Sequence, residues 1–257
     1  MVYDREVVEV AGVGGVAGFG GVAGVAGVGG VAGVGVVAGA GVVVGVGGLG
    51  RILTMPIPMT TPSLRFDESE HRYFFDNLEA VGVTRMIRSM GLDKDWTLID
   101  PKYRIRGKAA HDVCCAIDAE EWDPDSTHPD LLCYGLAYQK FLKDTGFQPV
   151  LIEHPVGSFA YRLAGTLDRW GFIGDTKWCI DLKTGEPVHP ACDLQVALYA
   201  YLLEQQEGKT SDKRMVVHLR KDGDWRAVEP TRPLSMDIAD GLAACRLYWL
   251  RSRWGLL

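Results

Sequence analysis

Two blocks of sequence decide the fold: Gly165-Thr-Leu-Asp168 and Ile180-Asp-Leu-Lys-Thr-Gly185. Each block belongs to an apolar run, which predicts strands over residues 162–172 and 178–182, and the Gly-Asp pair between the runs predicts a turn. Strands joined by a short turn can pair antiparallel. We therefore expect Asp168 and Asp181 to face each other across two neighbouring strands.

The second strand carries the residues that define the chemistry. Successive side chains of a strand point to opposite faces, so Asp181 and Lys183 share one face and Leu182 takes the other. Two carboxylates and an ammonium then converge, and the carboxylates repel each other unless a cation lies between them. Mg²⁺ and Mn²⁺ prefer such oxygen ligands, and a lysine beside the ion can position or deprotonate a water whose pKa the metal lowers. The pattern therefore indicates a metal site that can hydrolyse a phosphodiester bond.

The simplest alternative is a surface ion pair between Asp181 and Lys183, with Asp168 unrelated to it. The composition of the strands argues against this alternative. Charged side chains are rarely buried, so a charged trio inside strands that are otherwise typical of a core needs a functional reason.

The remaining periodicity predicts an α/β fold, in which a central mixed sheet is flanked by helices. Two short strands around a polar turn are expected within residues 64–76, and further strands over 150–156 and 215–219. The expected helices cover residues 83–90, 107–121, 129–146, 190–206 and 235–252.

The N-terminal segment differs in composition from the rest. Residues 10–50 contain no charged side chain, and 18 of these 41 residues are glycine. A membrane span, a phosphate-binding glycine loop and a flexible or spurious extension are the alternatives; the glycine content disfavours the first, and no P-loop lysine supports the second. A disordered Gly/Val/Ala-rich extension is favoured because such a chain cannot offset its ordering entropy. We expect residues 1–54 to form it and 55–257 to form the domain, with Met55 or Met59 as candidate starts.

Charge and cysteine usage exclude several classes of protein. A net charge of −6 argues against a basic protein that wraps nucleic acid, although two local basic clusters remain. The clusters are Lys102, Arg104, Arg106 and Lys108, and Arg246, Arg251 and Arg253. No Cys-x-x-Cys pair or zinc-type spacing occurs among the six cysteines, so free thiols in a reducing cytoplasm are expected.

Four blocks in order resemble the RecB-type and phage-type nucleases of the PD-(D/E)XK superfamily, over roughly residues 64–220. The blocks are Arg106-Gly-Lys-Ala-Ala-His111, Gly165-Thr-Leu-Asp168, Ile180-Asp-Leu-Lys-Thr-Gly185 and Gln195-Val-Ala-Leu-Tyr199. The resemblance implies a restriction-endonuclease-like core. The sequence differs from the CRISPR-associated members of the superfamily, because no group of cysteines near the C-terminus matches the ligands of their iron–sulfur cluster.

The resemblance implies a role for each matching residue. The metal ligands would be His111, Asp168, Asp181, the backbone carbonyl of Leu182, and Glu153 on the first strand. Lys183 would assist the nucleophilic water. Gln195 and Tyr199 lie four residues apart on one helix face, and would support the site and contact DNA. The other histidines, His71, His128, His154, His189 and His218, show no comparable pattern and are expected to be structural.

The expected function is cleavage of DNA by a Mg²⁺- or Mn²⁺-dependent exonuclease in phage-type recombination or repair. A single-strand annealing or recombination protein is a possible partner, and we expect a stand-alone nuclease domain in the cytoplasm with no membrane role. Arg104, Arg106 and Lys108 are hypothesised to guide the phosphate backbone towards His111. Two alternatives stay open: a structure-specific endonuclease on the same core, and an inactive nuclease fold that only binds DNA.

Overall fold

The computed structural model describes residues 62–93, 100–185, 188–228, 230 and 232–257, together with the backbone of two short strands near the N-terminus. The chain divides into two compact units, Met1–Thr61 and Pro62–Leu257. Within the first unit, β1 (Val34–Val37) pairs antiparallel with β2 (Gly41–Val44). The prediction that residues 1–54 form a disordered extension falls, apart from these two strands, on residues outside the described part of the chain. In the described part of the chain, no helix is both long and apolar enough to cross a bilayer.

The second unit is built on an eight-stranded sheet, and the prediction of a mixed sheet is confirmed. Its strands are β3 (Leu64–Asp67), β4 (Arg72–Phe75), β5 (Leu78–Gly82), β6 (Gln148–Ser158), β7 (Leu163–Ile173), β8 (Thr176–Lys183), β9 (Lys213–Leu219) and β10 (Trp225–Val228). The order is β10-β9-β8-β7-β5-β4-β3, and β6 also pairs with β7. The pairs β5–β7 and β8–β9 are parallel, and the others are antiparallel.

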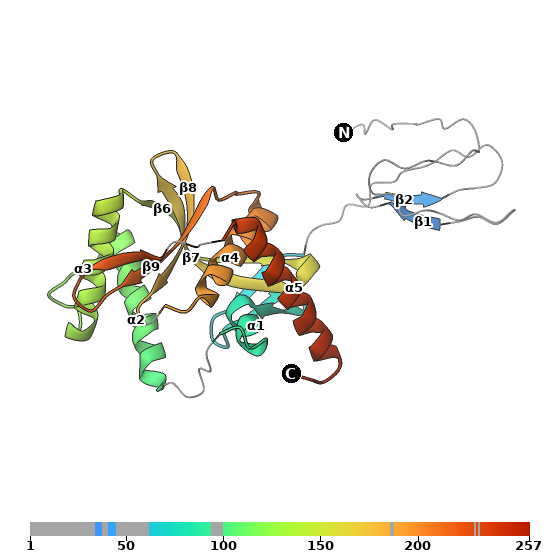
Figure 1. Ribbon diagram of the computed structural model, residues 1–257, viewed down its shortest axis with the longest axis horizontal. Helices are drawn as coiled ribbons and strands as arrows, with labels where there is room; N and C mark the ends of the chain where they lie inside the picture. The colour runs from blue at the N-terminus through green and yellow to red at the C-terminus, as the bar shows by residue number, and fades with distance from the viewer. Residues whose placement is uncertain are drawn as a thin grey trace, which may run out of the picture. The chain divides into compact units, whose positions relative to one another are not determined.

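Helices cover both faces of the sheet (Figure 1). They are α1 (Val83–Ser89), α2 (Pro101–Asp118), α3 (Pro129–Thr145), α4 (Ala191–Glu207) and α5 (Leu234–Arg253). On one face α2 and α3 pack with β8, β9 and β10, and on the other α1, α4 and α5 pack with β5 to β9. Because both faces are covered, β7 and β9 are buried over most of their length, and β8 is buried from Cys179 to Leu182.

Strand β7 has a break in its pairing that positions the site. Along one edge it pairs with β6 for most of its length. Along the other edge β5 pairs with Leu163 and Ala164, whereas β8 pairs only from Arg169 onward. Among the described strands, residues 165–168 therefore have no ladder partner on that edge. Asp168 lies at the end of this gap, where the β7–β8 register would place it opposite Asp181.

Three elements differ from the sequence predictions. The helix expected over residues 107–121 begins earlier, at Pro101, because Asp100 Oδ1 accepts a hydrogen bond from Lys102 N at 2.9 Å and proline suits the first helical position. Strands β5 and β10 were not predicted. Both are short, at five and four residues, and neither shows a strong alternation of apolar and polar residues.

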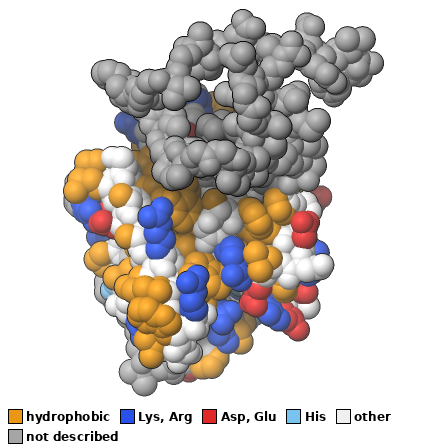
Figure 2. Space-filling view, turned by 90° about the vertical axis from the view of Figure 1, so that its right-hand side faces the viewer, with side chains coloured by type: hydrophobic (Ala, Val, Ile, Leu, Met, Phe, Trp, Pro, Cys, Tyr) orange, Lys and Arg blue, Asp and Glu red, His pale blue; other side chains and the backbone are white. Residues whose placement is uncertain are grey.

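Helix α5 closes the fold, and its two sides differ in character. The inner side packs on α4 so closely that a Cβ added at Gly241 would lie 2.7 Å from Leu198 Cδ2. The outer side leaves Leu247, Leu250 and Trp254 exposed. The face in Figure 2, on the side of α1 and α5, mixes hydrophobic with Lys and Arg side chains.

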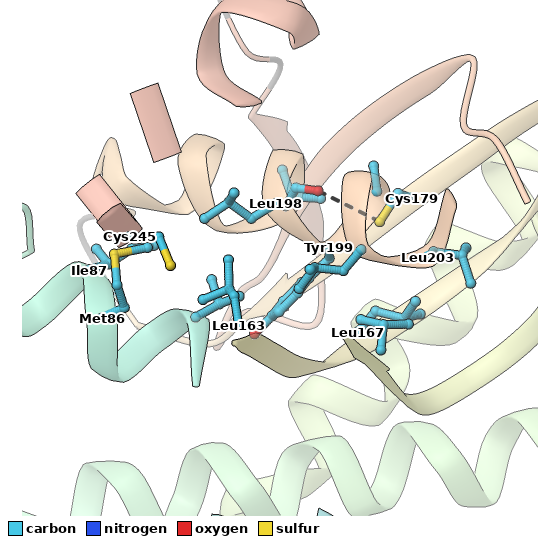
Figure 3. Close-up of a cluster of buried hydrophobic side chains, with 14 of the residues drawn as sticks. Met86, Ile87, Leu163, Leu167, Cys179, Leu198, Tyr199, Leu203 and Cys245 are labelled. Carbon is cyan, nitrogen blue, oxygen red and sulfur yellow. Dashed lines mark hydrogen bonds between the residues drawn. The ribbon is translucent and has the colours of Figure 1, made fainter. Parts of the chain in front are cut away.

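The larger core lies between the sheet and α1, α4 and α5 (Figure 3). Leu163 and Leu167 of β7 point towards Leu198 and Leu203 of α4, and all four are fully buried. Burying a leucine side chain contributes roughly 1.5–3 kcal/mol. A contact from Cys179 Sγ to the Val196 carbonyl at 3.8 Å joins β8 to α4. The two strands that carry the charged residues are thus fixed by apolar packing on α4.

Candidate active site

Three side chains from three elements form a compact cluster of metal-type donors. They are His111 on α2, Glu153 on β6 and Asp168 on β7, and one donor atom of each lies within 4.8 Å of the other two. The three side chains are partly buried, with exposed fractions of 23%, 35% and 10%, so water and a ligand can reach them. The resemblance named all three as ligands, and the fold brings them together.

His111 links the cluster to β8. Its Nδ1 donates to Glu153 Oε1 at 3.1 Å and its Nε2 donates to the carbonyl oxygen of Leu182 at 3.2 Å. Burial alone would lower the pKa of His111, but the carboxylates of Asp168 and Glu153 outweigh burial and raise the pKa to about 9. The imidazole is therefore protonated at neutral pH, and its positive charge lies between the carboxylates.

Glu153 occupies an irregular point of β6. Its neighbours Ile152 and His154 pair with Arg169 and Leu167, so Glu153 lies across from Asp168. Its φ of +43° falls in the left-handed region, which a non-glycine residue adopts only where the surroundings enforce it. Burial alone would raise the pKa of Glu153, but the hydrogen bonds and positive charges of His111 and Arg169 together outweigh burial and hold the pKa below its usual value.

Leu182 connects Asp168 and His111 through its backbone. Its N–H donates to Asp168 Oδ2 at 2.7 Å, while its carbonyl oxygen accepts from His111. Its side chain is fully buried in the core under α2 and α3, on the face opposite to its charged neighbours, as the strand period predicted. The backbone carbonyl named by the resemblance therefore lies within hydrogen-bond distance of the histidine named with it.

Asp181 and Lys183 form a separate pair beside the cluster. Lys183 Nζ lies 2.5 Å from Asp181 Oδ2, and the Asp181 carboxylate is fully buried. Burial raises the pKa of Asp181 to about 6. Among the described residues, Asp181 Oδ1 has no hydrogen-bond partner, so this oxygen retains capacity for another ligand. The structure thus keeps Asp181 outside the three-residue donor group and pairs it with the lysine instead.

Gln195 and Tyr199 are fixed to each other on α4. Gln195 Nε2 donates to Tyr199 Oη at 2.9 Å and to Thr84 Oγ1 at 3.3 Å. The Tyr199 ring lies against the backbone of Gly165, where a Cβ would come within 2.5 Å of the ring. Burial raises the pKa of Tyr199 well above its usual range, so the phenol stays protonated. This pair supports the part of β7 that leads to Asp168.

Apart from the fully buried Asp181, these residues line one cleft of about 1840 Å³. Arg104, Arg106 and Lys108 of α2 also line it, whereas the arginines of α5 do not appear among its described lining residues. Three histidines that the sequence reasoning set aside, His71, His189 and His218, lie along the same cleft. Their only sequence signal was residue type, because none of the three belongs to one of the four blocks.

The donor set fits a hard divalent cation. It contains an imidazole nitrogen, the carboxylates of Glu153 and Asp168, and a backbone carbonyl, with the Asp181 carboxylate nearby. Carboxylates gathered this closely repel each other unless positive charge lies among them. In the structure the protonated His111 supplies that charge, and a bound Mg²⁺ or Mn²⁺ would supply it more strongly.

The sequence reasoning missed Arg169, whose side chain is fully buried directly behind the cluster. It donates to Asp118, Tyr138 and Glu153 from the strand position next to Asp168. The sequence feature that could have revealed it is an arginine within the largely apolar strand, in the run Leu167-Asp-Arg-Trp170. Such a residue requires a buried partner, and the partner carboxylate lies 51 positions earlier in sequence.

The fold and this cleft define a class of protein: α/β enzymes in which a mixed sheet and one helix bring carboxylates, a histidine and a lysine to a metal-type site. A model of the PD-(D/E)XK nuclease superfamily matches residues 95–243, which is more than half of the chain, and the chain belongs to that superfamily. The matched region includes His111, Glu153, Asp168, Asp181 and Lys183. The superfamily predicted from the four blocks is thus confirmed. A search of curated proteins found no match.

Proposed function

We propose that this chain is a Mg²⁺- or Mn²⁺-dependent deoxyribonuclease, and that it acts as an exonuclease. The observation that carries the proposal is the convergence of His111, Glu153 and Asp168 with the Leu182 carbonyl in a cleft that also holds Lys183. Membership of a nuclease superfamily supports phosphodiester hydrolysis. The exonuclease activity, and its place in recombination or repair beside a single-strand annealing protein, rest on the resemblance of the four blocks.

In this proposal His111, Glu153, Asp168, Asp181 and the Leu182 carbonyl hold the cation. A bound divalent ion lowers the pKa of a coordinated water and polarises the scissile phosphate. Lys183, whose pKa is raised by Asp181 despite burial, remains an ammonium that orients the attacking water and offsets charge developing on the phosphate. Gln195 and Tyr199 keep the backbone before Asp168 in place.

Basic side chains of α2 are proposed to bring DNA to this point. Arg104 and Lys108 are exposed, and with Arg106 they line the cleft one to two helical turns before His111. Phosphate contacts of this kind supply sequence-independent affinity. The acidic net charge is compatible with this role because the basic groups are local.

The direct test is digestion of linear and closed circular DNA, each single- and double-stranded, with Mn²⁺ or with EDTA. We expect Mn²⁺-dependent loss of linear DNA, with closed circles intact. Lys183→Ala is the control and should be inactive while remaining folded. Cleavage of closed circles would indicate an endonuclease instead, and DNA binding without cleavage of any substrate would indicate an inactive nuclease fold.

A further inference from the structure

The buried guanidinium of Arg169 stands between the donor cluster and the helical layer. Its side chain is fully buried, and so is that of Asp118, its partner on α2. Arg169 Nε donates to Asp118 Oδ2 at 2.7 Å and to Tyr138 Oη at 3.2 Å. An arginine in this position is costly to bury, and it is stabilised only because hydrogen-bond partners surround it.

The other arm of Arg169 reaches the donor cluster itself. Its Nη1 donates to Glu153 Oε1 at 3.0 Å and to the backbone carbonyl of Asp168 at 2.6 Å. The same Glu153 oxygen accepts from His111 Nδ1 at 3.1 Å. One guanidinium nitrogen therefore fixes a side chain of the cluster and the backbone of a second cluster residue at once.

Helix α2 contributes to both ends of this network. His111 and Asp118 are seven residues apart, which places them two turns apart on the same face of the helix. That face presents His111 to Glu153 and Asp118 to Arg169. Tyr138 Oη donates to Asp118 Oδ1 at 2.8 Å and so joins α3 to the same network.

The irregular backbone of Glu153 needs such a restraint. Its φ of +43° breaks the regular course of β6 directly across from Asp168. A non-glycine residue in that region costs on the order of 1–3 kcal/mol, so neighbouring interactions must hold it. In this conformation Glu153 Oε1 accepts hydrogen bonds from Arg169 Nη1 and His111 Nδ1, and these contacts supply the restraint.

We propose that Arg169 is a positioning residue, which holds the Glu153 carboxylate in the metal-binding cluster and is itself oriented by Asp118. Asp118 offsets the positive charge of the guanidinium, so that Glu153 keeps a net attraction for a cation. The proposal rests on the metal-dependent function proposed above and deepens it. In this proposal a hydrogen-bonded network that begins at Tyr138 of α3 and passes through Asp118 and Arg169 holds Glu153 in place.

The test is a titration of the full chain with Mn²⁺ alone, without DNA, followed by electron paramagnetic resonance. Residues that orient metal ligands typically change metal affinity by about 10–100-fold when substituted. We expect Arg169→Lys, which keeps the charge but cannot reach both carboxylates, to weaken Mn²⁺ binding by about tenfold or more. Arg214→Lys is the matched control, because Arg214 is a buried arginine paired with Asp237 away from the cluster. It should bind Mn²⁺ like the wild type.

A double-mutant cycle separates positioning from general destabilisation. If Arg169 acts through Glu153, then Arg169→Lys in a Glu153→Gln background should change Mn²⁺ affinity by no more than about twofold. The titration extends to millimolar Mn²⁺ so that weak binding is still measured. Should Arg169→Lys not fold, Asp118→Asn carries the test and is expected to weaken Mn²⁺ binding severalfold.

The outcomes distinguish this proposal from the function on which it rests. Wild-type affinity in folded Arg169→Lys or in Asp118→Asn overturns the role of Arg169, as do additive effects in the cycle. In those cases the wild type still binds Mn²⁺ and the proposed nuclease stands. If the wild type itself binds no Mn²⁺, the metal-dependent function fails, and the assignment of Arg169 fails with it.

Discussion

At the scale of single residues, the site is a set of charges that compensate one another in a partly buried place. His111 lies between Glu153 and Asp168, Arg169 is shared between Glu153 and Asp118, and Lys183 pairs with Asp181. Removing one member leaves its partner with an uncompensated charge, which is costly in a desolvated position. For each substitution at the site, both the cleavage rate and the folding of the variant should therefore be measured.

Lys183 offers the clearest change in activity. Lys183→Ala removes the ammonium beside the proposed water and should lower the cleavage rate by at least about a hundredfold. It also leaves the buried Asp181 without its partner, so the pKa of Asp181 should rise above its present value of about 6. Single-turnover cleavage with Mn²⁺, with circular dichroism to confirm folding, measures the loss. A folded Lys183→Ala variant with wild-type rate would remove lysine from the mechanism.

Metal binding should release a proton from His111. The pKa of His111 is raised from 6.5 to about 9, because the nearby carboxylates outweigh burial, and a metal ligand must be unprotonated. Apparent Mn²⁺ affinity should therefore rise with pH until about pH 9. In the metal-free protein the raised pKa stabilises the fold below about pH 6.5, and this contribution disappears as the pH rises through about 9.

Calorimetry in two buffers of different ionisation enthalpy measures the released proton, and repeating the titration at several pH values measures the trend. His111→Gln is the control, since it keeps polar side-chain atoms but cannot be protonated in this range. Mn²⁺ affinity that does not change from pH 6.5 to 9 in the wild type would exclude His111 as a ligand.

At the scale of elements, strand β7 determines the site. Its gap between β5 and β8 gives Asp168 access to the cleft, and α4 supports that gap through Tyr199. The pairing of β7 with β8 and the shared face of Asp181 and Lys183 could be predicted from the period of two and the turn between the runs. The gap could not, because it depends on where the unpredicted strand β5 ends.

Gly165→Ala tests the support of β7 by α4. A Cβ at this position would lie 2.5 Å from the Tyr199 ring, so the ring and Gln195 must move. Such overpacking typically costs about 1–3 kcal/mol, and we expect lower thermal stability together with a lower cleavage rate.

Gly107→Ala is the matched control for that substitution. Gly107 lies inside α2, and among the described residues its added Cβ would meet only Thr184 Oγ1, at 3.7 Å. Replacing a helical glycine should raise stability by about 0.5–1 kcal/mol. Thermal denaturation of both variants decides the point, and equal stability of Gly165→Ala and the wild type would contradict the contact with Tyr199.

At the scale of the whole molecule, charge is distributed unevenly around an acidic average. The net charge is −6, yet Arg104, Arg106 and Lys108 line the cleft. Both basic clusters were visible in the sequence. Their different positions were not, because that depends on which helix lies beside the cleft, and α2 begins two turns before the predicted start.

Alanine at Arg104, Arg106 and Lys108 together should weaken DNA binding uniformly across sequences and reduce its dependence on salt. The matched control is alanine at Arg246, Arg251 and Arg253, which changes net charge equally on α5. Fluorescence anisotropy with Ca²⁺ in place of Mn²⁺, at several salt concentrations, measures both. Equal affinity losses in the two variants would indicate a general charge effect rather than a path along α2.

The four blocks in the sequence were sufficient to predict the superfamily and most of the cluster, since chemistry-bearing residues there lie in short, regular patterns. Arg169, Asp118 and Tyr138 were not predicted as a network. They come from β7, α2 and α3, and only the packing of these elements brings them together. The ion pair between Asp181 and Lys183 was considered from the sequence as a surface pair, whereas in the structure the Asp181 carboxylate is fully buried beside the three-residue cluster.

The most direct test of the central claim is an anomalous difference map from crystals of this chain soaked in Mn²⁺. The account predicts one peak in contact with His111, Glu153, Asp168, Asp181 and the Leu182 carbonyl. A saturated crystal with no peak among these residues, or with its peak elsewhere, would contradict it.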